Sequence, residues 1–94
     1  MNQMLANLSQ YTATLLKCAD ETTRAEDRNV YMQHLAANAR MFVAAYQGQH
    51  ASLMEMVASE RRAFGWGYLS GTEGSAAERA FDQFAKTIET TPGA

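Results

Sequence analysis

The sequence predicts an all-α protein, and the expected architecture is a small antiparallel up-and-down four-helix bundle whose second helix is the longest. Three observations predict this class. There are 17 alanines and seven leucines but only three valines and one isoleucine, so β-strands have little material. The single proline, Pro92, stands near the C-terminal end, so none interrupts the rest of the chain. Three Ser/Thr-x-x-Glu patterns occur where an apolar periodicity restarts, which is typical of helix N-termini.

These patterns and the glycines set the expected helix boundaries. A Ser or Thr at the N-cap bonds a free backbone amide of the first turn, and the Glu three residues later bonds back. The three pairs are Thr23 with Glu26, Ser52 with Glu55, and Ser75 with Glu78. Asn2 can cap a first helix, and Gly48 can end the second. We therefore expect one helical domain over 1–90, with helices near 2–19, 23–47, 52–68 and 75–90, a loop over 70–74 and a flexible tail over 91–94.

Three of the four expected helices show one clear apolar face. Such faces predict the core, and short loops favour antiparallel neighbours. The faces comprise Met1, Met4, Leu8, Tyr11, Leu15 and Cys18 in the first helix; Leu53, Met56, Val57, Phe64 and Tyr68 in the third; and Ala77, Phe81, Phe84, Ala85 and Ile88 in the fourth.

The second helix is unusual in length and in charge. About 25 residues would span roughly 37 Å, against about 24–27 Å for the others. From Asn29 to Met54 the only charged residue is Arg40. One stripe contains Tyr31, Leu35, Ala39, Phe42 and Tyr46; a second stripe beside it contains His34, Asn38, Met41 and Ala45, joined by Ala37, Ala44 and Val30.

Two interpretations of the second stripe remain open at this point. A helix that is apolar nearly all round is normally buried on most sides, so the stripe is expected to form an interface. Self-association as a two-fold homodimer is the simplest form of that interface. The alternative is an alanine-rich face that is exposed without consequence, because alanine is a good helix former.

Composition excludes several classes of protein. Ten acidic and eight basic residues give a net charge of −2, and the adjacent pair Arg61-Arg62 directly follows Glu60, so nucleic-acid binding is not expected. The chain has no apolar run of about 18 residues for a membrane span and no secretory-type N-terminal segment. A lone cysteine, Cys18, fits a reducing compartment. A cytoplasmic protein without membrane contact is expected.

Glu60 is a candidate functional residue because it falls among the apolar positions of the third helix. A carboxylate there requires a partner or a raised pKa. The candidate partners are His34, Arg28 or a tyrosine hydroxyl of Tyr11, Tyr31 or Tyr46. In a functional role, Glu60 is a general acid or base or a ligand contact. In a structural role, it belongs to a buried ion pair or lies at the edge of the core and reaches solvent.

Two other groups are candidate contact residues. His34 lies one helical turn from both Tyr31 and Asn38, and the three could form a polar site or simply a hydrogen-bonded part of the core. Trp66 lies between two glycines in the segment Phe64–Tyr68, where it could anchor a partner or fold over the end of the bundle. The sequence contains no Glu-x-x-His pair and no Cys/His cluster, so neither a metal nor a cofactor is expected.

No enzyme motif is present, so the sequence favours a non-enzymatic protein-interaction module. Adaptors, chaperone-like proteins and inhibitor or immunity proteins all fit this class, and the expected partner is a second copy, another protein, or both. The alternative is a small-molecule-binding bundle with an apolar, aromatic pocket between the second and third helices. The predicted contact residues are Trp66, Tyr31, His34, Asn38, Glu60, Ala37 and Met41.

Overall fold

Four α-helices form almost all of the part of the chain that the structure describes. The structure, a computed structural model, describes residues 2–65 and 71–90, with the side chains of 3–64 and 76–90. The helices are α1 (Asn2–Glu21), α2 (Ala25–Tyr46), α3 (His50–Gly65) and α4 (Gly71–Thr90). None of these residues lies in a β-strand. The all-α prediction with four helices is confirmed.

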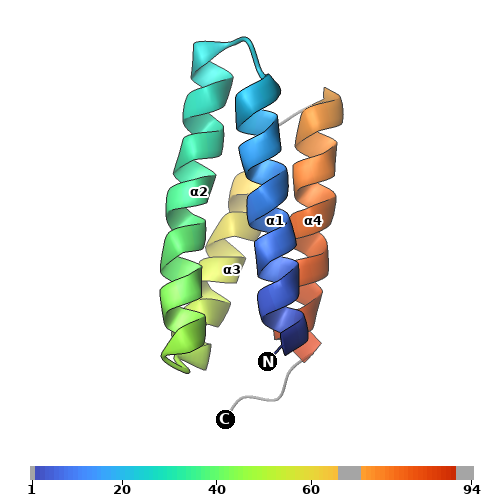
Figure 1. The fold of residues 1–94 in the computed structure, drawn as a ribbon. Coiled ribbons are helices and arrows are strands. Elements are labelled where there is room, and N and C mark those ends of the chain that lie inside the picture. Colours follow the sequence, from blue (N-terminus) through green and yellow to red (C-terminus); the bar gives the residue numbers. More distant parts are fainter. Residues whose placement is uncertain (1, 66–70, 91–94) are drawn as a thin grey trace.

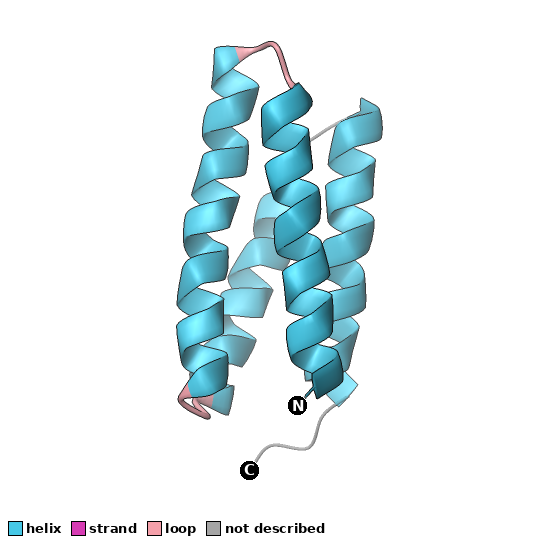
Figure 2. Ribbon diagram, in the orientation of Figure 1, coloured by secondary structure: helices cyan, strands magenta, loops and turns pink. Residues whose placement is uncertain are grey.

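The helices lie side by side as an elongated bundle, with extents of 42 × 21 × 17 Å. α1 packs between α2 and α4, and α3 packs mainly against α2, with a smaller contact to α4 (Figure 1). The loop of residues 22–24 stands at one end of the bundle and the turn of residues 47–49 at the other (Figure 2). α3 is the shortest helix at 16 residues, so it covers only part of its neighbours.

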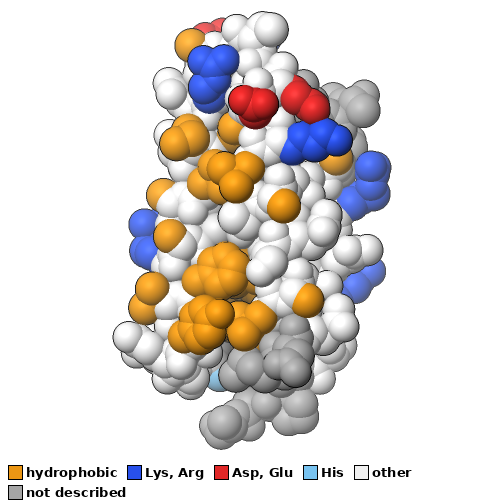
Figure 3. Space-filling view, in the orientation of Figure 1, with side chains coloured by type: hydrophobic (Ala, Val, Ile, Leu, Met, Phe, Trp, Pro, Cys, Tyr) orange, Lys and Arg blue, Asp and Glu red, His pale blue; other side chains and the backbone are white. Residues whose placement is uncertain are grey.

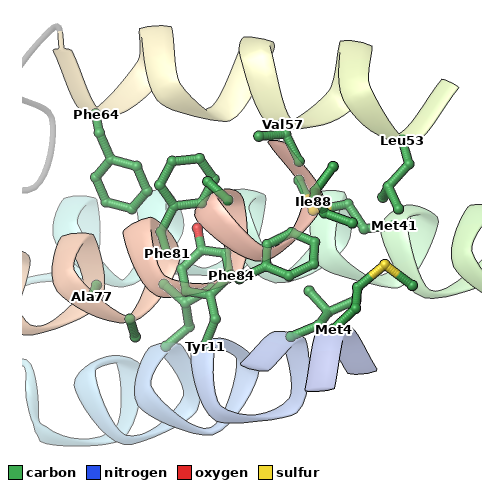
Figure 4. Close-up of a cluster of buried hydrophobic side chains, with 14 of the residues drawn as sticks. Met4, Tyr11, Met41, Leu53, Val57, Phe64, Ala77, Phe81, Phe84 and Ile88 are labelled. Carbon is green, nitrogen blue, oxygen red and sulfur yellow. The ribbon is translucent and has the colours of Figure 1, made fainter. Parts of the chain in front are cut away.

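The core forms along the apolar faces that the sequence predicts. On α1, every described member of the predicted seam is at most 7% exposed. All five predicted positions of α4 are buried as well, and in α3 Leu53, Val57 and Phe64 are buried while Met56 is partly buried. The larger side chains point toward one another between the helices (Figure 4). The described residues of these faces are Met4, Leu8, Tyr11, Leu15 and Cys18 in α1 and Ala77, Phe81, Phe84, Ala85 and Ile88 in α4.

The capping boxes predicted for the N-termini of α2 and α3 are wrong. α2 begins at Ala25, after Arg24, whose backbone is extended (φ −96°, ψ 126°) and whose side chain forms no cap. Thr23 therefore lies outside the helix. α3 begins at His50, so Ser52 lies inside its first turn rather than at its N-cap. A Ser/Thr-x-x-Glu pattern is compatible with positions before or inside a helix, because it does not fix the backbone dihedrals of its first residue.

The predicted start of the last helix is also wrong, because α4 begins at Gly71 and includes Ser75 in its interior. Gly71 and Gly74, expected in a loop, are helical. A glycine costs a helix only about 1 kcal/mol relative to alanine, so the helical hydrogen-bond ladder can extend through both. The predicted extension of the third helix to Tyr68 falls outside the described residues, as does Trp66.

The predicted stop at Gly48 is confirmed in detail. Gly48 has φ +69°, a left-handed conformation that glycine adopts without a steric penalty. Its amide donates to the Ala45 carbonyl at 3.2 Å, and the Gln49 amide donates to the Ala44 carbonyl at 2.9 Å, which is the Schellman pattern. α2 thus has 22 residues, against 20 in α1 and in α4. At 1.5 Å per residue, the predicted overhang shrinks to roughly 3 Å relative to these two helices.

The two stripes of α2 differ in burial. The second stripe, which supplies the predicted contact residues, faces the core, with His34 5%, Asn38 1% and Met41 0% exposed. In the first stripe Tyr31 is buried, whereas Ala39 is exposed and Tyr46 is 74% exposed. Neighbouring helices supply hydrogen-bond partners to the two polar side chains, so these can be buried. Met41 is therefore excluded as a surface contact of the folded chain.

Candidate functional site

Glu60 lies at the centre of a buried polar contact that joins three helices. The Tyr11 hydroxyl of α1 donates to Glu60 Oε2 at 2.7 Å. His34 Nδ1 of α2 lies 2.6 Å from the same oxygen. Glu60 is 7% exposed and His34 5%. The prediction that Glu60 needs a partner is thus confirmed, and two of its candidate partners hold it; Arg28, another candidate, instead donates to the Thr22 carbonyl.

Aromatic side chains surround this contact and fix its geometry. The Phe64 ring stacks on His34, with centroids 4.9 Å apart and an interplanar angle of 22°. Phe81 meets Tyr11 edge-on at 5.5 Å. Burial raises the pKa of the Tyr11 hydroxyl above its ordinary value, and the nearby Glu60 carboxylate raises it further. Tyr11 therefore remains a neutral donor across the physiological pH range.

Glu60 and His34 each have a second polar side-chain atom that takes no part in this contact. The structure gives no hydrogen bond to Glu60 Oε1 or to His34 Nε2 within its described part, and neither atom is fully enclosed. Both residues line a groove of about 510 Å³ between α2 and α3. The leftover atoms therefore open into this groove. Its lining consists of Val30, Gln33, His34, Ala37, Arg40, Ser59, Glu60 and Ala63.

This groove differs from the apolar, aromatic pocket that the sequence suggests. Charged and polar side chains form much of its wall, and it continues along Ala37 and Arg40 into a hollow of about 370 Å³ beside Glu55. Tyr31 and Phe64, expected to line the pocket, belong to the hydrophobic core instead. Trp66 lies outside the described residues. Of the predicted contact residues, the structure brings His34, Glu60 and Ala37 together at the groove.

Asn38 has a separate structural contact. Its side-chain amide donates to the Thr12 hydroxyl of α1 at 2.9 Å, and that hydroxyl donates to the Leu8 carbonyl. Asn38 Oδ1 is buried without a hydrogen-bond partner in the described part of the chain. Asn38 therefore joins α1 to α2 and does not share the Glu60 contact. Nothing in the sequence singled out Thr12, because a hydroxyl in a helix carries no sign of a partner on another helix.

A second candidate site is an apolar surface along the line where α1 meets α2. Leu16 is 55% exposed, Met32 54%, Val43 54% and Tyr46 74%. On α1, Leu5 and Leu16 stand near Thr12, whose contact with Asn38 marks the side that faces α2. On α2, Leu35 and Phe42 stand one turn to either side of Asn38. We call this surface the α1–α2 face, and it comprises Leu5, Leu16, Met32, Leu35, Phe42, Val43 and Tyr46.

The α1–α2 face contains no charged side chain. No charged residue precedes Lys17 in the chain, and in α2 the only charge from Asn29 onward is Arg40, which lines the groove on the α3 side. In Figure 3, apolar side chains gather along the front of the molecule, and the charged ones stand toward one end and the edges. α2 thus carries excess apolar surface, but it lies away from His34, Asn38 and Met41, which were among the predicted contact residues.

Sequence reasoning missed most members of this face, although a signal was present. Met32, Leu35, Ala39, Phe42 and Tyr46 follow one another at steps of three and four residues. This spacing is a second apolar seam. The spacing shows that an apolar seam exists, but it does not show which of the two seams of α2 is exposed.

Other features of the described residues are structural. Arg61 ties α3 to α4 through Glu89 at 2.8 Å and Asp82 at 3.4 Å, and its guanidinium stands 5.5 Å from the Phe81 ring centroid. In the described part of the chain, no three His, Cys, Asp or Glu side chains are arranged to hold a metal ion. Nor does any helix there combine the length and apolar character that a membrane span needs.

Comparison with known proteins identifies no relative of this chain. No protein-family model, no curated protein and no solved structure matches this chain. Any functional assignment must therefore come from the two surfaces described above.

Proposed function

We propose that this protein is a non-enzymatic helical interaction module that acts through the α1–α2 face, and that a second copy of the chain is its partner. The observation that carries this proposal is the simultaneous exposure of Leu16, Met32, Val43 and Tyr46 on one uncharged surface. Contiguous exposed apolar patches are uncommon on monomeric proteins and mark interaction sites.

The proposal includes an antiparallel up-and-down arrangement of the helices. Asn7, near the start of α1, donates to the Thr87 hydroxyl near the end of α4 at 2.6 Å. Thr12 contacts Asn38 across α1 and α2. Both contacts fit neighbours that run in opposite directions. In such a bundle, α1 and α2 from two copies form a second four-helix layer about a two-fold axis.

The charge pattern favours a second copy over a charged partner. A strongly charged partner would find nothing to pair with on the α1–α2 face, and two copies of the face meet without like-charge repulsion. The charged residues of this side, including Lys17, Asp20 and Glu21, lie toward the end of α1. They form the polar edge that interface cores usually have.

The exposed area predicts a weak dimer. Burying the exposed part of each of the four side chains contributes about 1 kcal/mol, or about 8 kcal/mol for two copies. Association costs roughly 4–15 kcal/mol of lost translational and rotational freedom, so the smaller, partly buried members must supply the remainder. Against the lower end of that cost, the four side chains alone leave about 4 kcal/mol, which is a dissociation constant of about 1 mM, and the partly buried members strengthen it. We therefore expect dissociation constants between about 10 µM and 1 mM.

Sedimentation analysis over a concentration series tests this proposal. The wild-type chain should shift from monomer to dimer as concentration rises. Val43→Glu should be monomeric at every concentration, because it places a charge on the α1–α2 face, and it should fold normally since Val43 is 54% exposed. Ala58→Glu is the matched control: it adds the same charge to an exposed alanine of α3 and should leave the dimer unchanged.

Two results would contradict self-association through the α1–α2 face. A wild-type chain that stays monomeric at about 1 mM refutes self-association, since even a weak dimer would form there. Dimers that persist in Val43→Glu and disappear in Ala58→Glu would place the interface on α3 instead. Circular dichroism of both variants must show wild-type helicity, so that a change in mass reports the interface.

A further inference from the structure

Met32 differs from the other methionines in its exposure to solvent. Its side chain is 54% exposed, and among the methionines whose side chains the structure describes it alone is exposed. The Cys18 thiol is buried, at 5% exposure. An oxidant in solvent therefore reaches the sulfur of Met32 more readily than the other described sulfur atoms. The remaining described methionines, buried or partly buried, are Met4, Met41, Met54 and Met56.

Met32 also lies on the α1–α2 face, close in height to Leu16. The loop of residues 22–24 joins α1 to α2 at one end of the bundle (Figure 2). Thr12 and Asn38 mark one level of the two helices, because their side chains are bonded. From that level toward the loop, Leu16 lies at roughly 6 Å and Met32 at roughly 9 Å, from the rise per residue of a helix. Two of the large exposed apolar side chains of this face thus lie at nearly the same height.

We propose that Met32 is a modification site, and that its oxidation to methionine sulfoxide by a peroxide separates the two copies of the chain. This inference rests on the proposed dimer through the α1–α2 face. Hydrogen peroxide transfers one oxygen atom to the thioether sulfur: an S–O bond forms, the O–O bond breaks, the sulfur loses two electrons and water is released. A thiol-dependent reductase reverses the step, because two thiols are oxidised to a disulfide and the oxygen leaves as water.

The added oxygen makes the α1–α2 face polar at Met32. The neighbouring Leu16, and Val43 on the same helix, have side chains that cannot donate a hydrogen bond to it. In the dimer each copy would bury one sulfoxide oxygen among apolar side chains, and a polar group buried without a partner opposes association. We therefore expect the dissociation constant to rise at least about thirtyfold, the equivalent of about 2 kcal/mol for the two oxygens.

The weakness of the dimer keeps Met32 accessible to the oxidant. Dissociation constants between about 10 µM and 1 mM leave a large share of monomer in dilute samples. In the monomer the Met32 side chain is exposed, whereas in the dimer the second copy covers it. The rate of Met32 oxidation should therefore fall as the protein concentration rises, and each oxidised chain should leave the dimer.

Sedimentation analysis before and after treatment with hydrogen peroxide tests the proposal, and mass spectrometry of peptides shows whether Met32 carries the oxygen. The readout is the ratio of the dissociation constants of one variant after and before treatment, so that the effect of the substitution itself cancels. The ratio should be at least about thirty for wild type and for Met54→Leu, which replaces a partly buried methionine of α3. It should be about one for Met32→Leu, which keeps every other oxidisable side chain.

A second variant and a reversal test the same step without relying on peroxide alone. Met32→Gln places a polar side chain of similar length on the α1–α2 face and should weaken the dimer in the same direction. Treatment of the oxidised wild type with a methionine sulfoxide reductase and a thiol should restore the original dissociation constant. Circular dichroism should be unchanged throughout, because Met32 is exposed. Loss of helicity on oxidation would attribute the dissociation to unfolding and refute the proposal.

Three further results would overturn this proposal and leave the proposed dimer intact. A wild-type dimer that survives complete oxidation of Met32 would show that the sulfur lies outside the interface. A ratio near thirty in Met32→Leu would assign the effect to another residue. A rate of Met32 oxidation that is independent of protein concentration while the dimer forms would show that the second copy does not cover it. A wild-type chain that is monomeric before treatment would refute the proposed function itself, and this inference with it.

Discussion

The contact of Tyr11, Glu60 and His34 makes a sharp prediction for the variant Glu60→Ala. The Glu60 carboxylate accepts from the Tyr11 hydroxyl at 2.7 Å and from His34 Nδ1 at 2.6 Å. Alanine removes this acceptor and leaves two donors in the core, where Tyr11 is 0% and His34 5% exposed. The structure shows no other acceptor among the described residues bonded to either donor.

The expected loss follows from these two donors. A buried donor left without a partner costs about 1–3 kcal/mol. Two such donors, with the lost packing of the Glu60 side chain, should lower the free energy of unfolding by about 3–5 kcal/mol. Domains of this size have a total stability of about 5–15 kcal/mol, so the variant should be strongly destabilised and in the extreme case unfolded.

Urea denaturation followed by circular dichroism measures this loss, with Glu55→Ala as the matched control. Glu55 lies on the same helix and is exposed, so its removal should change the free energy of unfolding by less than about 0.5 kcal/mol. If both variants unfold at nearly the same urea concentration, the buried contact does not stabilise the fold.

A double-mutant cycle with Tyr11→Phe separates the contact from the cavity. In Tyr11→Phe/Glu60→Ala one of the two orphaned donors is absent, so the double variant should be more stable than the sum of the single losses predicts. We expect a coupling energy of at least about 1 kcal/mol between the two residues. Strict additivity would refute a direct interaction between Tyr11 and Glu60.

Three further predictions concern stability. The pKa of Tyr11 is raised in the folded chain, so its contribution to stability is present below the unfolded value of 10.0 and is lost as the pH rises above it. Tyr11→Phe should therefore make the free energy of unfolding fall less steeply at alkaline pH, by about 1.4 kcal/mol per pH unit. Tyr46→Phe, at an exposed tyrosine, should leave this slope unchanged. Gly48→Ala should lower stability by about 1 kcal/mol in urea because φ is +69°, and Gly48→Asn should lose less. A hydrogen bond from Lys86 lowers the pKa of Asp82, so the Asp82 carboxylate stabilises the fold at pH values above its unfolded pKa of 3.8 and loses this effect as the pH falls through its folded pKa. Asp82→Asn should reduce the pH dependence of the free energy of unfolding on the acid side only, by at most about 1 kcal/mol.

The features that the sequence predicts correctly are determined by residues close together in the chain. The seams of α1 and α4 are read correctly because in each helix a continuous apolar stripe recurs at three- and four-residue steps with no charged residue in it. The stop at Gly48 is also local, since only glycine adopts its backbone conformation without strain. Glu60 is recognisable as a residue in need of a partner for the same reason: its position in the apolar pattern of α3 is visible in the sequence alone.

What the sequence does not predict depends on contacts between helices. α2 carries two apolar stripes, and its sequence does not say which of them faces the core. In the structure His34 and Asn38 are buried because Glu60 of α3 and Thr12 of α1 supply partners to these two polar side chains. No pattern within one helix reveals a partner on another. The helix starts fail similarly, because a capping pattern does not state the conformation of the backbone before it.

We infer that this protein acts through the α1–α2 face, and NMR spectra recorded over a concentration series decide whether that face self-associates. Between dilute and concentrated samples, the signals of Leu16, Met32, Val43 and Tyr46 should shift with the population of the dimer, and those of Arg79 on the outer side of α4 should stay constant. Spectra that do not depend on concentration, or shifts that gather on α4 instead, would show that the α1–α2 face is not the surface of self-association.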